Sequence, residues 1–349
     1  MTGRLRVAVA APLAPELCKL VTSLEPRIDL VVDQSLLPPM RHPADFSGDP
    51  SFRRTSAQQA AYEEMLDSAD VLYGIPDVDP GALARTVRAN PLLRWVHTMA
   101  AGGGGQVRAA QLTADELERV VFTTSAGVHG DALAEFAVFG VFAGAKHLPR
   151  LLEQQRKRVW SGRWMMSHVS DQTVLVLGLG GIGARVAAKL SALGVTVIGT
   201  SRSGTSVPGV ARTIHPDAVG EVLPHVDAVV TTLPGTDATH HLVGREFFAA
   251  LKPGATVVNV GRGTVVDEQA LLEALDAGVV GFTALDVFEV EPLPGNSPLW
   301  AHPRVLVSPH TAALDAREDR RIAELFAGNA TRFLDGVPMR NVVDTVEFY

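Results

Sequence analysis

Three side chains able to move protons or bind anions stand at similar positions in the second half of this 349-residue sequence. Arg262, Glu291 and His310 each follow a short apolar run typical of a buried strand. An imidazole exchanges protons near neutral pH, and a carboxylate beside its other ring nitrogen fixes the tautomer and favours the imidazolium. A guanidinium offers a planar fork that suits a carboxylate or a polarised carbonyl. Alone, each residue has an ordinary explanation as a surface charge, a loop acid or a structural histidine. Together they predict a site that binds a small anion and transfers a proton.

A glycine turn earlier in the chain indicates what lies beside these side chains. Residues 174–177 favour a strand, Gly178-Leu-Gly-Gly-Ile-Gly183 follows, residues 186–193 favour a helix, and 195–198 form a second apolar run. This βαβ pattern is typical of a dinucleotide site, in which the pyrophosphate lies at the helix N-terminus. We expect Gly178, Gly180, Gly181, Ile182 and Gly183 to form the cofactor-binding turn, with the backbone at Gly180 approaching the phosphates.

The residues that follow the second apolar run, 195–198, indicate which dinucleotide is bound. An NAD site usually carries an acidic residue there, whereas this sequence has Ser201-Arg202-Ser203. A guanidinium between two hydroxyls suits a 2′-phosphate, which a carboxylate would repel. NADP is therefore the expected cofactor, with NAD as the alternative. Arg202 could instead be a solvated loop charge that binds no cofactor. Other strand ends supply further expected cofactor contacts, namely Leu233, Pro234, Val260, Gly261, His310 and Ala312.

Strand and helix patterns alternate along both halves of the chain, which favours a doubly wound parallel α/β architecture in two domains. The junction is expected near residues 125–130. Residues 37–55 are predicted to form a long irregular loop, either a lid or simply mobile. Strands are expected at 5–10, 28–32, 71–75, 92–99, 228–233, 256–260, 282–284 and 305–307; helices are expected at 15–24, 58–68, 80–89, 131–147, 216–223, 245–251, 268–277 and 315–334.

Composition excludes several other classes of protein. The net charge of −7 disfavours nucleic acid and anionic membranes as partners. A single cysteine, Cys18, rules out an intrachain disulfide framework and favours a cytoplasmic location. Residues 132–145 are apolar but too short to span a bilayer, and they carry Glu135. Residues 5–10 fit a first strand better than a signal peptide. No metal site is predicted.

Three motifs carry a family resemblance. They are Asn259-Val-Gly-Arg-Gly-Thr-Val-Val-Asp267, Leu285-Asp-Val-Phe-Glu-Val-Glu-Pro292 and Pro309-His310. Their order and spacing resemble those of the D-isomer-specific 2-hydroxyacid dehydrogenases, especially the glyoxylate and hydroxypyruvate reductase branch. The similarity covers nearly the whole chain.

The resemblance implies a role for each motif. Arg262 would hold the carboxylate and carbonyl of a small 2-keto acid, Glu291 would orient His310, and His310 would exchange the proton. Asp286 would contact the nicotinamide amide, and the backbone of Ala101 and Gly102, at the start of a glycine run, would bind the substrate carboxylate. From the run alone, a flexible turn at Ala101–Gly102 is an equally good reading.

The resemblance also implies an organisation. Residues 1–125 and 312–349 would form a discontinuous, flavodoxin-like substrate domain, and residues 126–311 a Rossmann domain through which the protein forms a homodimer. Two departures lie on the substrate side: Gly104 stands where the family often has Asp, and Thr124-Ser125-Ala126 replaces the common Asn-x-Pro hinge. They leave the substrate's identity and the closure geometry in doubt, but not the hydride chemistry.

Three other hypotheses fit the sequence less well. A nucleotide-sensing, corepressor-like binding protein of the same fold would lack significant turnover, but no acidic tail, basic patch or peptide motif supports it. Formate dehydrogenases pair the histidine with a preceding Gln, where this chain has Pro309. L-specific lactate and malate dehydrogenases place the glycine turn at the N-terminus rather than in mid-chain.

Overall fold

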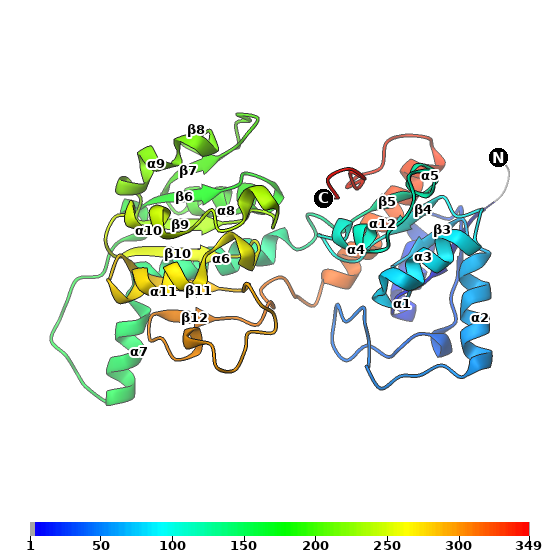
Figure 1. Ribbon diagram of the computed structural model, residues 1–349, viewed down its shortest axis with the longest axis horizontal. Helices are drawn as coiled ribbons and strands as arrows, with labels where there is room; N and C mark the ends of the chain where they lie inside the picture. The colour runs from blue at the N-terminus through cyan, green and yellow to red at the C-terminus, as the bar shows by residue number, and fades with distance from the viewer. Residues whose placement is uncertain (1–3, 349) are drawn as a thin grey trace. The chain divides into compact units, whose positions relative to one another are not determined.

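Short parallel strands alternate with helices in the computed structural model, which describes residues 4–348. The chain divides into two units. Unit 1 holds the described residues up to His129 and those from Leu314 onward, and unit 2 is Gly130–Ala313. In Figure 1, the blue, cyan and red parts of the ribbon belong to unit 1, and unit 2 runs from green to orange.

Unit 1 is built on a five-stranded parallel sheet in the order β2-β1-β3-β4-β5. This order is the doubly wound arrangement of flavodoxin-like folds. The strands are β1 (Leu5–Val9), β2 (Ile28–Val31), β3 (Val71–Tyr73), β4 (Trp95–His97) and β5 (Val121–Thr123). The helices are α1 (Pro15–Leu24), α2 (Ser56–Asp67), α3 (Pro80–Ala89), α4 (Gly104–Ala109), α5 (Ala114–Arg119) and α12 (Glu318–Leu334).

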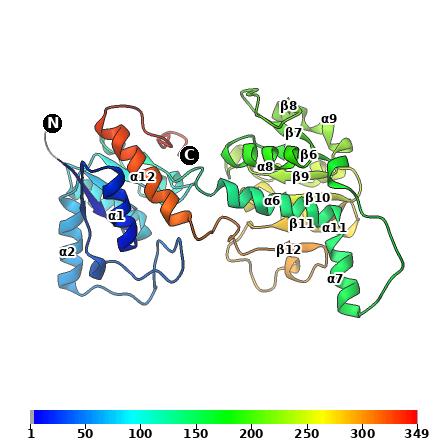
Figure 2. The same ribbon diagram turned by 180° about the vertical axis from the view of Figure 1, so that it is seen from behind.

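Helix α12, from near the end of the sequence, completes the core of unit 1. It packs beside α1, as Figure 2 shows. The buried ring of Phe326 stacks on Trp95 with 4.9 Å between ring centroids, and meets Tyr73 edge-on at 5.0 Å. Large aromatic side chains contribute much of the apolar area that a core buries. The N-terminal sheet therefore depends on residues more than two hundred positions later in the chain.

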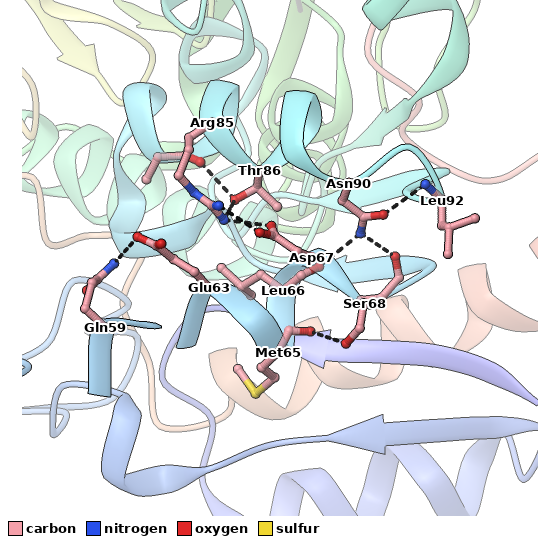
Figure 3. Close-up of polar contacts among 12 residues, drawn as sticks. Gln59, Glu63, Met65, Leu66, Asp67, Ser68, Arg85, Thr86, Asn90 and Leu92 are labelled. Atoms are coloured by element: carbon pink, nitrogen blue, oxygen red, sulfur yellow. Dashed lines mark hydrogen bonds and ion pairs between the residues drawn. The ribbon is translucent and has the colours of Figure 1, made fainter. Parts of the chain in front are cut away.

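Polar contacts fasten α2 to α3 on unit 1 (Figure 3). The two terminal nitrogens of Arg85, Nη1 and Nη2, donate to the Asp67 carboxylate at 2.9 and 2.8 Å. The buried Asn90 amide donates to Leu66 O at 3.0 Å and to Ala69 O at 2.7 Å. These bonds tie the end of α3 to carbonyls at and just beyond the C-terminus of α2, where bonds within the helix run out.

The irregular loop expected over residues 37–55 contains no helix or strand and is held by a buried carboxylate. Asp45 pairs with Arg41 at 2.7 Å, and this contact lowers the pKa of Asp45 to about 2. The amide of Ala44 donates to Asp319 Oδ1 at 3.0 Å. The loop is therefore attached to the N-terminal turn of α12.

Unit 2 is built on a seven-stranded parallel sheet in the order β12-β11-β10-β9-β6-β7-β8. The two all-parallel sheets confirm the predicted fold class. The strands are β6 (Thr173–Leu177), β7 (Thr196–Thr200), β8 (Arg212–Ile214), β9 (Ala228–Thr231), β10 (Ala255–Asn259), β11 (Val280–Leu285) and β12 (Val305–Val307). The helices are α6 (Gly130–Ala145), α7 (Leu148–Lys157), α8 (Gly181–Ala192), α9 (Val219–Val222), α10 (Arg245–Ala249) and α11 (Glu268–Asp276).

Successive side chains of β6 point into different halves of the unit 2 core. Val174 and Val176 pack with α6 and α8, whereas Leu175 and Leu177 pack with α10 and α11. A parallel strand covered on both faces is expected to be apolar throughout, as this one is. Helix α6 lies very close to β10: a Cβ on Gly144 would stand 1.9 Å from Thr256 Oγ1. Its small residues therefore set how closely the helix approaches the sheet.

Most predicted elements occur, with shifted ends. Helices α1 and α3 and strand β12 have the predicted bounds. Residues 148–157, for which no element was predicted, form α7. Helix α8 begins five residues earlier than expected, at Gly181. Among residues 4–348, no helix combines the length and apolar composition that crossing a membrane requires.

A buried histidine makes the stability of unit 1 depend on pH. His97 is fully buried, its Nδ1 lies 2.8 Å from Thr123 Oγ1, and its Nε2 lies 3.2 Å from Ser125 Oγ. Burial lowers its pKa from 6.5 to about 3. Between these two values the unfolded chain binds a proton that the folded chain does not, so His97 opposes folding as the pH falls below 6.5.

We expect the stability advantage of the native protein over a His97→Gln variant to shrink on acidification. From pH 7 to pH 5 the difference in unfolding free energy should fall by about 2 kcal/mol, since one pKa unit corresponds to about 1.4 kcal/mol. Urea unfolding at several pH values measures it, with His225→Gln, an exposed histidine, as the matched control. A difference that stays constant with pH would contradict the neutral, buried state of His97.

Candidate active site

The glycine turn joins β6 to α8 with little room for side chains. Gly178 has φ +93°, and a Cβ on Gly183 would stand 1.9 Å from Gly178 O. Around Gly180 nothing lies within 4 Å of a Cβ position, so the backbone is open at the start of α8. Unpaired amides at a helix N-terminus bind phosphate well. The turn therefore has the close packing and the open backbone that a pyrophosphate site needs.

The end of β7 carries hydroxyls and one cation. Ser201 Oγ lies 3.1 Å from Ser203 Oγ, which lies 2.7 Å from Thr205 Oγ1. Arg202 is exposed and forms no ion pair within the described part of the chain. No acidic residue occurs in the segment 201–209. This edge can accept an additional phosphate without charge repulsion.

The loops after β9 and β10 lie against each other. A Cβ on Gly261 would stand 2.6 Å from Leu233 O, and a Cβ on Gly235 would stand 3.3 Å from Arg262 Cβ. Asn259 braces the turn, because its Oδ1 accepts from Gly261 N at 3.0 Å and its Nδ2 donates to Arg262 O at 3.0 Å. Arg262 itself is exposed, with Nη1 donating to the adjacent Gly261 O at 2.7 Å. Its guanidinium is thus available to a ligand.

Asp286 ties the end of β11 to the segment after β12. Its buried carboxylate accepts through Oδ1 from Ser308 Oγ at 2.5 Å and from the amides of Thr311 and Ala312, each at 3.0 Å. Its other oxygen, Oδ2, is buried and has no hydrogen-bond partner. Buried polar atoms are rarely left unpaired. An N–H donor such as the nicotinamide carboxamide would satisfy Oδ2, so the residues present fit that cofactor.

Glu291 and His310 form a direct pair. Glu291 Oε2 lies 2.7 Å from His310 Nδ1, and Glu291 Oε1 accepts from Phe288 N at 3.0 Å. His310 has φ +52°, and its side chain is 48% exposed. The carboxylate holds one ring nitrogen and leaves Nε2 free to exchange a proton with a ligand.

The remaining predicted substrate contacts lie in unit 1. Ala101 and Gly102 are exposed between β4 and α4. The turn needs glycine at the next position, because a Cβ on Gly103 would stand 1.8 Å from Thr98 Oγ1. The glycine run is thus at least in part a steric requirement.

Sequence reasoning missed several residues that shape the site. Asn259 begins one of the motifs and Ser308 directly precedes another, but neither was given a role. Asn259 braces the Arg262 turn, and Ser308 donates a hydrogen bond to Asp286. A polar residue at the end of a buried strand was the available signal. Within residues 4–348, no cluster of three or more His, Cys, Asp or Glu side chains could hold a metal ion.

A parallel sheet with a glycine turn, a carboxylate-anchored histidine and a free arginine defines a dinucleotide-dependent oxidoreductase. Comparison with known proteins identifies the group. Residues 138–312 match the family model described as D-isomer specific 2-hydroxyacid dehydrogenase, NAD binding domain. The chain belongs to the D-isomer specific 2-hydroxyacid dehydrogenase family, which confirms the resemblance drawn from the motifs. It is an NAD(P)-dependent 2-hydroxyacid dehydrogenase.

Similar proteins extend over most of the chain. A glyoxylate reductase from Aeropyrum pernix is 33% identical over 301 residues, which is 82% of this chain and 87% of that protein. A D-isomer specific 2-hydroxyacid dehydrogenase from Xanthobacter autotrophicus, solved with NADPH and MES, has a TM-score of 0.77 at 30% identity and covers 100% of both chains. An NADPH-dependent glyoxylate/hydroxypyruvate reductase from Sinorhizobium meliloti, solved with NADP and sulfate, has a TM-score of 0.75 at 26% identity and covers 99% of this chain and 100% of that one.

Proposed function

We propose that this protein reduces small 2-keto acids, glyoxylate and hydroxypyruvate among them, with NADPH as the preferred hydride donor. The observation that carries the proposal is the 2.7 Å contact between Glu291 and His310, on the segment that Asp286 anchors. The names of the Aeropyrum and Sinorhizobium relatives support the choice of substrates.

The proposed mechanism assigns each side chain one task. When bound, the nicotinamide supplies the hydride, and Asp286 Oδ2 holds its carboxamide. Arg262 binds the carboxylate and carbonyl of the keto acid, and its charge stabilises the negative charge that develops on the carbonyl oxygen. His310, protonated on Nε2, donates a proton to that oxygen. Glu291 keeps the imidazole oriented and favours its cationic form.

Each domain has an assigned role in this proposal. Residues 126–311 form the dinucleotide-binding domain, in which the glycine turn and the loops after β9 and β10 hold the cofactor. Residues 1–125 and 312–349 form the substrate domain, in which the Ala101 and Gly102 backbone binds the substrate carboxylate. The exposed position of both residues supports this assignment.

The cofactor preference rests on the end of β7. Arg202 lacks an ion-pair partner within the described residues, and hydroxyl groups flank it. A 2′-phosphate would give this guanidinium a charge-assisted partner. The Xanthobacter and Sinorhizobium structures, solved with NADPH and NADP, support the same choice.

A homodimer accounts for exposed apolar side chains on unit 2. Phe139 on α6 is 47% exposed, and beyond α7 the side chains of Trp160 and Met165 are 100% and 93% exposed. Large apolar groups gathered on one surface segment commonly mark an interface. We therefore propose that α6, α7 and residues 158–166 contact a second copy. A cytoplasmic location is also proposed, since the buried Cys18 is a free thiol.

Replacement of His310 tests the proton transfer. His310→Gln should lower kcat for glyoxylate about 10²–10⁴-fold, because general acid catalysis typically contributes that much. The Kd for NADPH should hardly change. NADPH oxidation is followed at 340 nm with a panel of 2-keto acids, and His225→Gln serves as control. Near-normal turnover by His310→Gln would remove His310 from the mechanism. NADPH binding by the native protein without turnover of any keto acid would favour a nucleotide-sensing role.

Replacement of Arg202 tests the cofactor preference. Arg202→Ala should lower kcat/KM for NADPH by about tenfold to a hundredfold, the range expected for one hydrogen bond to a charged group. The value for NADH should stay within a factor of about two, since NADH lacks the phosphate that Arg202 would bind. A clear NADH preference in the native protein would contradict the assignment.

Replacement of the exposed apolar side chains tests the dimer. Size-exclusion chromatography with light scattering should give a dimer for the native protein and a monomer for Trp160→Ser combined with Met165→Ser. Substituting Val346, which is 82% exposed in unit 1, with Ser should leave the mass unchanged. A monomeric native protein at micromolar concentration would overturn the proposal.

A further inference from the structure

Two glutamates join the N-terminus of α11 to the loop after β11. Glu289 Oε1 accepts from Glu268 N at 2.8 Å, and Glu268 Oε1 accepts from Glu289 N at 2.8 Å. The two hydrogen bonds are reciprocal, and their partners lie 21 positions apart in the sequence. They form a double link between a helix end and a loop.

The link between Glu268 and Glu289 satisfies a backbone amide at the N-terminus of α11. Glu268 is the first residue of α11, and the first amides of a helix have no acceptor within the helix. Asp267 satisfies Ala270 N at 2.9 Å, so Glu289 supplies the second acceptor at the same end. A carboxylate is favoured there because the helix dipole is positive at its N-terminus.

Two carboxylates in one half-buried place also carry a cost. Burial, together with the negative charge of Glu289, raises the pKa of Glu268, while the hydrogen bond from Glu289 N partly offsets the rise. His241 Nε2 lies 3.3 Å from Glu289 Oε1 and is the nearby group that becomes cationic on protonation. The two hydrogen bonds from backbone amides offset the repulsion between the Glu268 and Glu289 carboxylates.

The linked loop touches both parts of the acid–base and anion-binding site. Glu291 lies two residues beyond Glu289, and its Oε1 accepts from Phe288 N within the same loop. On the other side, a Cβ on Gly263 would stand 1.9 Å from the Phe288 carbonyl carbon and 2.5 Å from Glu289 N. Gly263 directly follows Arg262. The backbone at residues 288–289 therefore abuts the Arg262 turn and carries the Glu291 side chain.

We propose that Glu268 and Glu289 are positioning residues, whose reciprocal bonds hold the 288–291 loop where Glu291 meets His310 and where Arg262 faces its ligand. This inference rests on the roles proposed above for Glu291, His310 and Arg262. Neither glutamate touches the reacting atoms; each acts through the loop. Displacing a catalytic group by about 1 Å can cost about a hundredfold in rate.

Shortening the Glu268 side chain provides the sharpest test. Glu268→Asp keeps a negative charge at the first position of α11, so the variant should fold. Its shorter side chain no longer brings the carboxylate within reach of Glu289 N. We expect kcat for glyoxylate to fall by about tenfold or more, with the KM for NADPH within a factor of about two. Glu268→Gln retains an acceptor of the same reach and should keep kcat within a factor of about two.

A matched control separates positioning from general stability. Glu273→Ala lies on the same helix and loses only surface contacts, an ion pair with Arg245 and a hydrogen bond from Gln269, so its kcat should equal that of the native protein. Circular dichroism and thermal melting verify folding of every variant. A folded Glu268→Asp protein with native kcat would overturn the inference, as would equal losses in Glu268→Gln and Glu268→Asp. If His310→Gln is fully active, the proposed function itself fails. If His310→Gln is impaired but Glu268→Asp is fully active, only the positioning role fails.

Discussion

One buried carboxylate oxygen organises the edge of unit 2 that carries His310. Asp286 Oδ1 accepts three hydrogen bonds from the segment 308–312, and so fixes where the chain turns after β12. His310 lies inside that segment with a left-handed backbone, a conformation that ordinary residues adopt only when neighbouring contacts impose it. The backbone of His310 is therefore placed by the hydrogen bonds to Asp286, and Glu291 then holds the imidazole ring through Nδ1. The second carboxylate oxygen of Asp286, Oδ2, has no hydrogen-bond partner and can accept one from a ligand.

Close backbone approach is the other constraint on the site. The loops after β9, β10 and β11 meet through Gly261 and Gly263, where any side chain would collide with the neighbouring main chain. Three strand ends are thereby joined with little space between them. Arg262 stands between these two glycines, so its side chain is the one that leaves the packed backbone and reaches outward. The close packing of these two glycines thus also determines where Arg262, the proposed anion-binding residue, leaves the backbone.

The sequence predicted the architecture well because its signals are local. Helix α1 begins at Pro15, which is preorganised for a first helical turn, and β6 is apolar at every buried position. The three-residue strands β5 and β8 escaped prediction, since β5 follows directly on the short helix α5 and β8 is exposed at Arg212; α7 escaped because it buries no side chain. The order of Arg262, Glu291 and His310 indicated a shared site, but the contact between Glu291 and His310 arises from how their two loops fold. The Glu268–Glu289 link joins distant segments through backbone amides, for which a sequence carries no signature.

The packing of α12 into the N-terminal sheet has a consequence for biosynthesis. Phe326 leaves the ribosome only after all of unit 2 has been made, and until then Trp95 and Tyr73 lack the ring that covers them. Unit 2, formed from one uninterrupted stretch, can close first as the nascent chain emerges. The half of the protein translated earliest is thus the last to become complete, and it must keep its apolar sheet from aggregating in the interval.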